Sequence, residues 1–253
     1  MTHPARKKWG QNFLTDPNIC RKIVGLLDLN DGEAVIEIGP GLGALTRELS
    51  KQNVELTGIE IDALCCEHLE KFKLPNLEIV NKDFLNYDLN KFDKPFKIIG
   101  NLPYYITTPI MFKVIKNRHW KKAVFMAQKE VVDRIAAFPG SKTYGRLTVM
   151  SNLFCQIKKE ISVPSHVFKP VPQVDSTVFS LTPKPVPKLI LAHVEEFENF
   201  IRGAFSQRRK VLRNSLKKYI TPKTDELYGS LRPEQLSLDE FKNIFTVWKN
   251  CVD

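Results

Sequence analysis

The sequence predicts an α/β fold with a mainly parallel β-sheet. Apolar segments of strand length alternate with segments of helical periodicity over the first half of the chain, and a glycine-rich turn with Gly39, Gly41 and Gly43 follows the first apolar segment. Apolar strands separated by amphipathic helices indicate a sheet that is covered on both faces. The 253 residues, 43% of them hydrophobic, are typical of a core-forming globular protein.

The first predicted element is a helix that begins after Asp16, because Asp is a good N-cap and Pro17 suits the first helical position. Apolar runs then predict parallel strands, and 3.6-residue periodicity predicts the helices between them. The strands are expected at 34–38, 54–59, 77–80, 96–99 and 123–127, and the helices at 43–51, 62–72, 108–117 and 129–137.

Segments 154–163 and 175–182 are joined by a proline-rich loop instead of a helix, which favours an antiparallel pair at the end of the sheet. The run from Pro183 to Pro187 cannot continue a helix or an inner strand, so it is expected to be a stiff linker. We therefore place a larger domain at residues 1–184 and a small helical domain at 185–253. Helical patterns in the second domain cover 193–219, 232–236 and 238–249, with Ser237 and Glu240 as a capping box.

The formal net charge of +10 and the sequence pI of about 9.3 favour a polyanionic partner. The five cysteines show no C-x-x-C pair and the five histidines no ligand spacing, so we expect reduced thiols, no metal site and a cytoplasmic protein. No stretch approaches the length of a membrane span, and the N-terminus has no apolar signal segment.

Polar and glycine residues follow the ends of the predicted parallel strands, the edge where such sheets bind ligands. Gly39 and Gly41 let the backbone approach a ligand closely, and Glu60, about twenty residues on, is placed to accept both hydroxyls of a ribose. Because Gly39-x-Gly41-x-x-Ala44 also fits the dinucleotide fingerprint, this motif alone leaves both NAD and S-adenosylmethionine open.

The third strand end carries Asp83 and Phe84, where a carboxylate would accept the adenine amino group and an aromatic ring would pack on the base. The alternatives are a helix cap for Asp83 and a core position for Phe84. The fourth strand ends in Asn101-Leu102-Pro103-Tyr104. The Asn101 side-chain oxygen and a backbone carbonyl beside Pro103 would accept the two hydrogens of an exocyclic amine, while Tyr104 stacks on the base. An ordinary Asn-Pro turn is the structural alternative.

The sequence closely resembles the bacterial ribosomal RNA adenine N6,N6-dimethyltransferases over nearly its whole length. The resemblance rests on residues 8–14, 37–46, 59–62, 83–85, 101–104, 128–131, 144–147, 168–176 and 205–210. It implies a Rossmann-like, seven-stranded S-adenosylmethionine-dependent methyltransferase sheet with a helical C-terminal RNA-recognition domain. It further implies contacts to S-adenosylmethionine from Asn12, Leu14, Gly39, Glu60, Asp83 and Asn101.

The substrate implied by the resemblance is a pair of adjacent adenosines in the 3'-terminal hairpin loop of 16S ribosomal RNA, each methylated twice within a pre-30S particle. The catalytic residues would be Asn101, Leu102, Pro103, Tyr104 and Phe168. A flipped-out adenine would stack between Tyr104 and Phe168, because base–aromatic stacking contributes roughly 1–3 kcal/mol per base. Phe168 has the alternative of packing on the sheet.

A phosphate-binding surface is predicted from residues 202–218, which hold seven basic residues and no acid. We expect RNA contacts from Arg146, Arg208, Arg209, Lys210 and Arg213, helped by Arg6, Lys7 and Lys8. The chain is expected to act as a monomer. Two other functions stay open at this point, namely a methyltransferase for large-subunit ribosomal RNA and a non-catalytic RNA-binding assembly factor.

Overall fold

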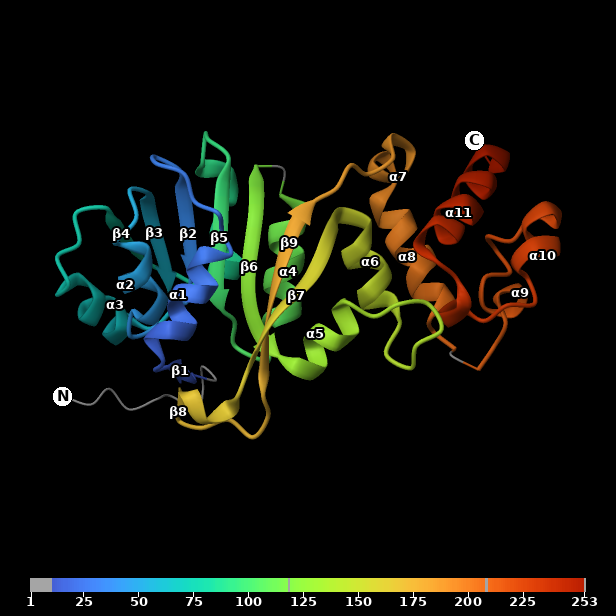
Figure 1. The fold of residues 1–253 in the computed structure, drawn as a ribbon. Helices are drawn as coiled ribbons and strands as arrows, with labels where there is room; N and C mark the ends of the chain where they lie inside the picture. Colours follow the sequence, from blue (N-terminus) through green and yellow to red (C-terminus); the bar gives the residue numbers. More distant parts are fainter. Residues whose placement is uncertain (1–10, 118, 208, 253) are drawn as a thin grey trace. The chain divides into compact units, whose positions relative to one another are not determined.

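A computed structural model describes residues 11–117, 119–207 and 209–252 of the chain (Figure 1). Its main sheet has seven strands in the order β4-β3-β2-β5-β6-β9-β7. The strands are β2 (Ala34–Ile38), β3 (Glu55–Glu60), β4 (Leu77–Asn81), β5 (Phe96–Asn101), β6 (Trp120–Gln128), β7 (Cys155–Val163) and β9 (Ser176–Pro183). Strands β2 to β6 pair in parallel and β9 is antiparallel to β6, which confirms the predicted fold class.

In the described part of the first unit and its continuation, the α-helices are α1 (Pro17–Gly25), α2 (Ala44–Leu49), α3 (Ala63–Glu70), α4 (Thr107–Lys116) and α5 (Lys129–Ile135). Helix α1 begins as predicted, since the Asp16 side chain accepts hydrogen bonds from the backbone amides of Asn18 and Ile19. It buries Ile23 and Val24 and packs against α2. Short 3-10 helices lie at η2 (Phe84–Asn86), η3 (Leu89–Lys91) and η4 (Ser165–Val167).

A second, two-stranded sheet was not expected from the sequence. Its strands β1 (Phe13–Leu14) and β8 (Phe168–Lys169) pair antiparallel, with Leu14 opposite Phe168. Thr15 extends this contact, because its backbone amide and its hydroxyl both donate to the Val167 carbonyl. The N-terminal segment is thereby fastened to the proline-rich loop.

The remaining helices are α6 (Arg146–Phe154), α7 (Lys188–Ala192), α8 (Val194–Ala204), α9 (Leu212–Ser215), α10 (Pro222–Tyr228) and α11 (Leu238–Val252), with the 3-10 helix η5 at Pro233–Gln235. Helix α6 was missed because most of its residues are buried, so no apolar stripe marks it. The long helical pattern at 193–219 is interrupted, since α8 ends at Ala204 and α9 begins at Leu212. The Ser237–Glu240 capping box at α11 is present.

The chain folds into two compact units. One comprises the residues up to Val132 together with Ile157–Pro183, and the other comprises Asp133–Gln156 and the residues from Lys184 onward. The first unit holds the sheet and a core of aliphatic side chains from β2, β3 and α1. The second has an aromatic core in which Phe197, Phe200 and Phe245 are fully buried. The division into catalytic and RNA-recognition domains stays a prediction.

None of the described helices combines the length and the apolar character that crossing a membrane requires. Likewise, no three side chains of the His, Cys, Asp and Glu types converge among the described residues as metal ligands would.

Close strand packing at Gly100, directly before Asn101, leaves no room for a side chain. A Cβ there would lie 2.8 Å from the Ile38 carbonyl oxygen, which belongs to the backbone of the neighbouring strand and cannot move aside. We therefore expect Gly100→Ala to lower the free energy of unfolding by about 1–3 kcal/mol. Gly25→Ala is the matched control, because nothing lies within 4 Å of a Cβ at that position. Thermal and denaturant unfolding of both variants measure the effect, and equal stability would contradict it.

Candidate active site

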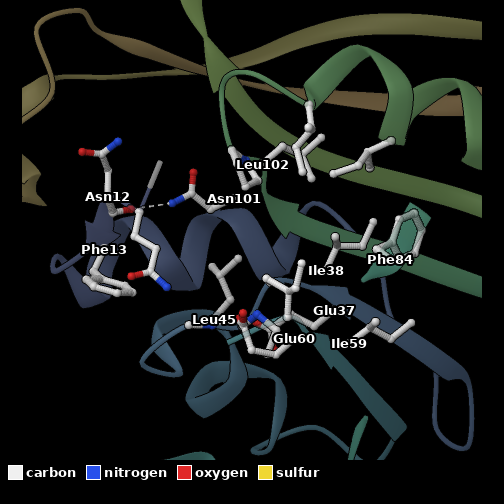
Figure 2. A pocket seen from close by; sticks show the side chains of 18 of the residues that line it. Asn12, Phe13, Glu37, Ile38, Leu45, Ile59, Glu60, Phe84, Asn101 and Leu102 are labelled. Carbon is white, nitrogen blue, oxygen red and sulfur yellow. Dashed lines mark hydrogen bonds between the residues drawn. The ribbon is translucent and has the colours of Figure 1, made fainter. Parts of the chain in front are cut away.

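A cavity of about 340 Å³ opens at the edge of the sheet where β2, β3 and β5 end (Figure 2). The residues that line it come from those strand ends, from the segments that follow β4 and β5, and from the N-terminal segment 11–14. All seven residues predicted to contact a cofactor line it, namely Asn12, Leu14, Gly39, Glu60, Asp83, Phe84 and Asn101, and so do Leu102, Pro103 and Tyr104. The structure thus brings together residues that are far apart in the sequence.

The glycine turn between β2 and α2 forms the floor of this cavity. Gly39, Gly41 and Gly43 all have positive φ angles, of 62°, 57° and 81°, a conformation that residues with a Cβ rarely adopt. At Gly43 a Cβ would also collide with the ring of Phe72 at 2.5 Å. Because these positions have no side chain, a ligand could approach the backbone of the turn closely.

Glu60 is held in place by the turn itself. One carboxylate oxygen accepts the Gly41 amide at 2.9 Å and the other accepts the Asp62 amide at 2.9 Å. Burial raises the pKa of the Glu60 carboxyl, and the two backbone hydrogen bonds oppose this shift. Each oxygen keeps a further lone pair, so the carboxylate can still accept hydrogen bonds from the hydroxyls of a ligand.

A second acid, Glu37, lines the cavity and was not predicted as a site residue. Its side chain is buried and accepts a hydrogen bond from the Thr46 hydroxyl at 2.7 Å. Burial, with a smaller contribution from the charge of Glu60, raises the pKa of Glu37 to about 8. Its place in the sequence, an acid at the end of an apolar strand just before the glycine turn, was the signal that could have found it.

Asp83 is a helix cap, as the structural alternative predicted, and it also lines the cavity. It caps η2, with one carboxylate oxygen accepting the Leu85 amide at 2.9 Å and the other the Asn86 side chain at 3.0 Å, and it also lines the cavity. Phe84 is buried and lines the same cavity. Capping and burial therefore do not remove either residue from the site.

The Asn101 side chain has a defined orientation. Its amide nitrogen donates to the Asn12 backbone carbonyl at 2.9 Å (Figure 2). Because a carbonyl can only accept, the nitrogen must face Asn12, and the side-chain oxygen is turned to the other side. The N-terminal segment therefore sets which atom of Asn101 remains available to a ligand.

The loop after Asn101 is anchored at several points. The Leu102 amide donates to the Met126 carbonyl at 2.9 Å, and the Tyr104 hydroxyl lies 3.3 Å from the Ser176 hydroxyl. The Pro103 carbonyl already accepts from the Ile106 amide and the Thr107 hydroxyl, both at 3.1 Å. Of the two carbonyls at this proline, that of Leu102 is therefore the better candidate to accept a ligand amine.

The N-terminal segment 11–14 covers one side of the cavity. The side-chain nitrogen Nε2 of Gln11 donates to an Asp62 carboxylate oxygen at 3.1 Å. The other end of the segment is held by the pairing of β1 with β8. The ring of Phe13 packs against Gly41, since a Cβ there would lie 3.0 Å from it. These contacts fasten the segment over the glycine turn.

Phe168 is the predicted catalytic residue that the structure does not bring to the cavity. Its side chain is completely buried in the hydrophobic core, with Leu14 opposite it across the β1–β8 pair. A ring with no exposed face cannot stack on a base, so this arrangement agrees with the alternative of a loop residue packed on the sheet. Tyr104, by contrast, is partly exposed and lines the cavity.

The predicted RNA contacts that the structure describes fall in the second unit and differ from one another. Arg146 forms an ion pair with Glu198 at 2.9 Å, and Arg213 forms one with Asp225 at 2.8 Å. Arg209 and Lys210 are exposed in the connection between α8 and α9. Arg208, Arg6, Lys7 and Lys8 lie outside the described residues.

Comparison with known proteins places this geometry in a family. A family model described as ribosomal RNA adenine dimethylase matches residues 2–248. The ribosomal RNA small subunit methyltransferase A of Chlorobium phaeobacteroides (strain DSM 266) is 44% identical over 250 residues, which cover 95% of this chain and 90% of that protein.

Two solved structures share the fold at 28% identity. The dimethyladenosine transferase from Plasmodium falciparum has a TM-score of 0.83, with 94% of this chain and 98% of that chain covered. The 23S rRNA methyltransferase ErmE has a TM-score of 0.76, with 94% and 100% covered.

Proposed function

This chain belongs to the ribosomal RNA adenine dimethylase family, and from that premise we propose that it methylates two adjacent adenosines in the 3'-terminal hairpin loop of 16S ribosomal RNA. It is an S-adenosylmethionine-dependent small-subunit rRNA adenine dimethyltransferase. The observation that carries the finer proposal is the orientation of Asn101, whose side-chain oxygen is left available beside the cavity by the hydrogen bond to Asn12.

The charges around the cavity favour S-adenosylmethionine over a dinucleotide. The acidic residues that line it are Glu37, Glu60 and Asp83. Among the described lining residues, Lys82 is the one basic residue. A dinucleotide would bring the negative charges of a pyrophosphate into this acidic surrounding, whereas a sulfonium brings a positive charge. The residues therefore fit the cofactor that the family implies.

Each end of the cofactor has candidate partners among these residues. Glu60 would accept the ribose hydroxyls, and Asp83 the adenine amino group, with Phe84 packed on the adenine ring. Gly39 gives the close backbone approach, and Asn12 and Leu14 cover the ligand from the N-terminal side. These assignments rest on position along the strand ends and on hydrogen-bonding capacity.

The chemistry requires that the adenine N6 lone pair be aimed at an electrophile. We propose that the Asn101 side-chain oxygen and the Leu102 carbonyl accept the two N6 hydrogens, which directs the nitrogen lone pair out of the hydrogen-bonding plane. S-adenosylmethionine supplies a methyl group on a sulfonium, so the new N–C bond forms as the S–C bond breaks. The N6 proton then passes to water, and the chain needs no strong base.

The second methylation follows from the same two acceptors. A monomethylated amine keeps one hydrogen, so one of the two carbonyl oxygens is enough to orient it. Tyr104 would stack on the flipped-out base, which offsets part of the few kcal/mol that unstacking costs. The contact of its hydroxyl with Ser176 fixes the ring in place beforehand.

We further propose that exposed basic side chains in the second unit bind the phosphate backbone of the rRNA. Arg209 and Lys210 are exposed, so they can contact phosphates without first breaking a buried contact. Arg146 and Arg213 already neutralise Glu198 and Asp225, which makes them weaker candidates. Arg208 joins this proposal on the sequence alone. The expected setting is a pre-30S particle in the cytoplasm, with the chain acting as a monomer.

The substrate is tested with small and large ribosomal subunits purified from cells that lack this protein. Each kind of subunit is incubated separately with the purified protein and labelled S-adenosylmethionine. We expect label in the small subunit alone, and mass spectrometry of its RNA should find two N6,N6-dimethyladenosines. Label in the large subunit would favour a 23S methyltransferase. RNA binding without any label would favour the non-catalytic assembly factor.

Asn101→Ala tests the amine-binding role. Loss of a preorganised hydrogen-bonding group of this kind lowers kcat by about 100-fold or more. We expect kcat to fall by that factor, while RNA affinity stays close to that of the original protein. Asn76→Ala is the matched control, because its side chain also donates to backbone carbonyls but lies outside the cavity. Full turnover by Asn101→Ala would refute the proposed mechanism.

Charge reversal tests the RNA surface. We expect Arg209→Glu/Lys210→Glu to weaken RNA affinity and to flatten its dependence on salt, because fewer counterions are released on binding. Lys71→Glu/Lys94→Glu changes the net charge equally on exposed positions of the first unit and serves as the control. Filter binding over a salt series, with cofactor affinity measured in parallel, gives the result. Equal losses in both variants would indicate a net-charge effect without a defined surface.

A further inference from the structure

Glu37 is the most deeply buried of the acids that line the cavity, with a relative exposure of 1% against 4% for Glu60. Its carboxyl accepts the hydroxyl of Thr46, itself buried in α2. Among the described residues, its titratable neighbours include the carboxyl of Glu60 at the end of β3 and the thiol of Cys20 in α1. None of these neighbours is a cation, although a buried carboxylate requires one or a proton.

The place of Glu37 follows from the strand register. Ile38, the next residue on β2, is paired with Ile59 on one side and with Gly100 on the other. Glu60 and Asn101 each lie one residue further on, so they stand on either side of the end of β2. A ligand whose ribose were held at Glu60 and whose methyl faced Asn101 would span the end of β2, where Glu37 also lines the cavity.

We propose that Glu37 determines specificity for the positively charged sulfonium over the uncharged thioether product, because its carboxyl gives up a proton when the cation lies above β2. The inference rests on the proposed function and assigns a role to a residue that the methyl transfer itself does not use. On binding, the Glu37 proton passes to solvent and leaves a carboxylate beside the sulfonium. After methyl transfer the sulfur is neutral, and the carboxyl takes a proton back.

The dependence on pH has a defined sign. In the unliganded protein the pKa of Glu37 is raised to about 8, so the group is mostly protonated at neutral pH. A cation above it lowers that pKa, so binding releases a proton. Affinity for S-adenosylmethionine therefore rises with pH, by up to about tenfold per unit below pH 8, and levels off above it. Affinity for the thioether product lacks this contribution.

Isothermal titration calorimetry of the full chain tests the proposal. The two ligands are S-adenosylmethionine and its thioether product, S-adenosylhomocysteine. Titrations between pH 6 and 9, in buffers of different ionisation enthalpy, count the protons released. Glu37→Gln keeps the shape of the side chain and an acceptor for Thr46 but cannot ionise. The amino groups of both ligands also titrate in this range, so the informative quantity is the difference between the wild type and Glu37→Gln for each ligand.

At pH 8 we expect Glu37→Gln to bind S-adenosylmethionine about tenfold more weakly and to bind S-adenosylhomocysteine with less than a twofold change. It should also release fewer protons with the first ligand only. The same ratio of the two affinities and the same proton release in both proteins would overturn the proposal.

A second variant keeps the test decisive should Glu37→Gln bind neither ligand. Thr46→Val removes a hydrogen bond that favours the ionised carboxyl, so the rise in S-adenosylmethionine affinity should move to higher pH. An unchanged midpoint would overturn the role of Glu37. A wild-type protein that binds neither ligand would instead refute the proposed function, which separates the two failures.

Discussion

The site depends on one constraint, the parallel pairing of β2 with both β3 and β5. This pairing fixes the ends of three strands at the same edge of the sheet, so that the glycine turn, Glu60 and Asn101 meet although they lie far apart in the sequence. Gly100 keeps β5 close to β2, because a side chain there would meet the Ile38 carbonyl. Glu60 and Asn101, each at the end of a rigid strand, can hold a methyl donor and an acceptor amine at a fixed separation. Direct transfer of a methyl group between two substrates requires such a fixed separation.

The N-terminal segment adds a second level of control. Its Asn12 carbonyl orients the Asn101 amide, while Phe13 packs on Gly41 and β1 pairs with β8. The segment that lines the cavity therefore also orients the side chain to which we assign the binding of the target amine. Displacement of segment 11–14 would break the hydrogen bond that orients the Asn101 amide.

The sequence predicts the strands well because a parallel sheet covered on both faces needs apolar residues at every position. It predicts the cavity lining for the related reason that ligands gather at strand ends. It does not reveal contacts between distant residues. The pairing of Arg146 with Glu198 spans 52 positions, and nothing local distinguishes this arginine from Arg209, which stays exposed. Phe168 was predicted at the site and its ring is buried in the core, a difference that the proline-rich loop could not reveal because it has no periodicity to separate a buried ring from an exposed one. Glu37, which lies within its strand, was not predicted as a site residue.

An acidic cavity has a consequence for the stability of the unliganded protein. The pKa of Glu37 is raised from 4.5 to about 8, so between these pH values the folded state binds more protons than the unfolded state. Stability contributed by this group therefore falls as pH rises through that window, and the loss is complete above pH 8. A residue that only supported the fold would be better served by a neutral side chain such as Gln. An acid at this buried position has a physical reason if a bound cation offsets the lower free energy of unfolding. On the proposed function, the protein would then give up some stability in order to bind a positively charged ligand.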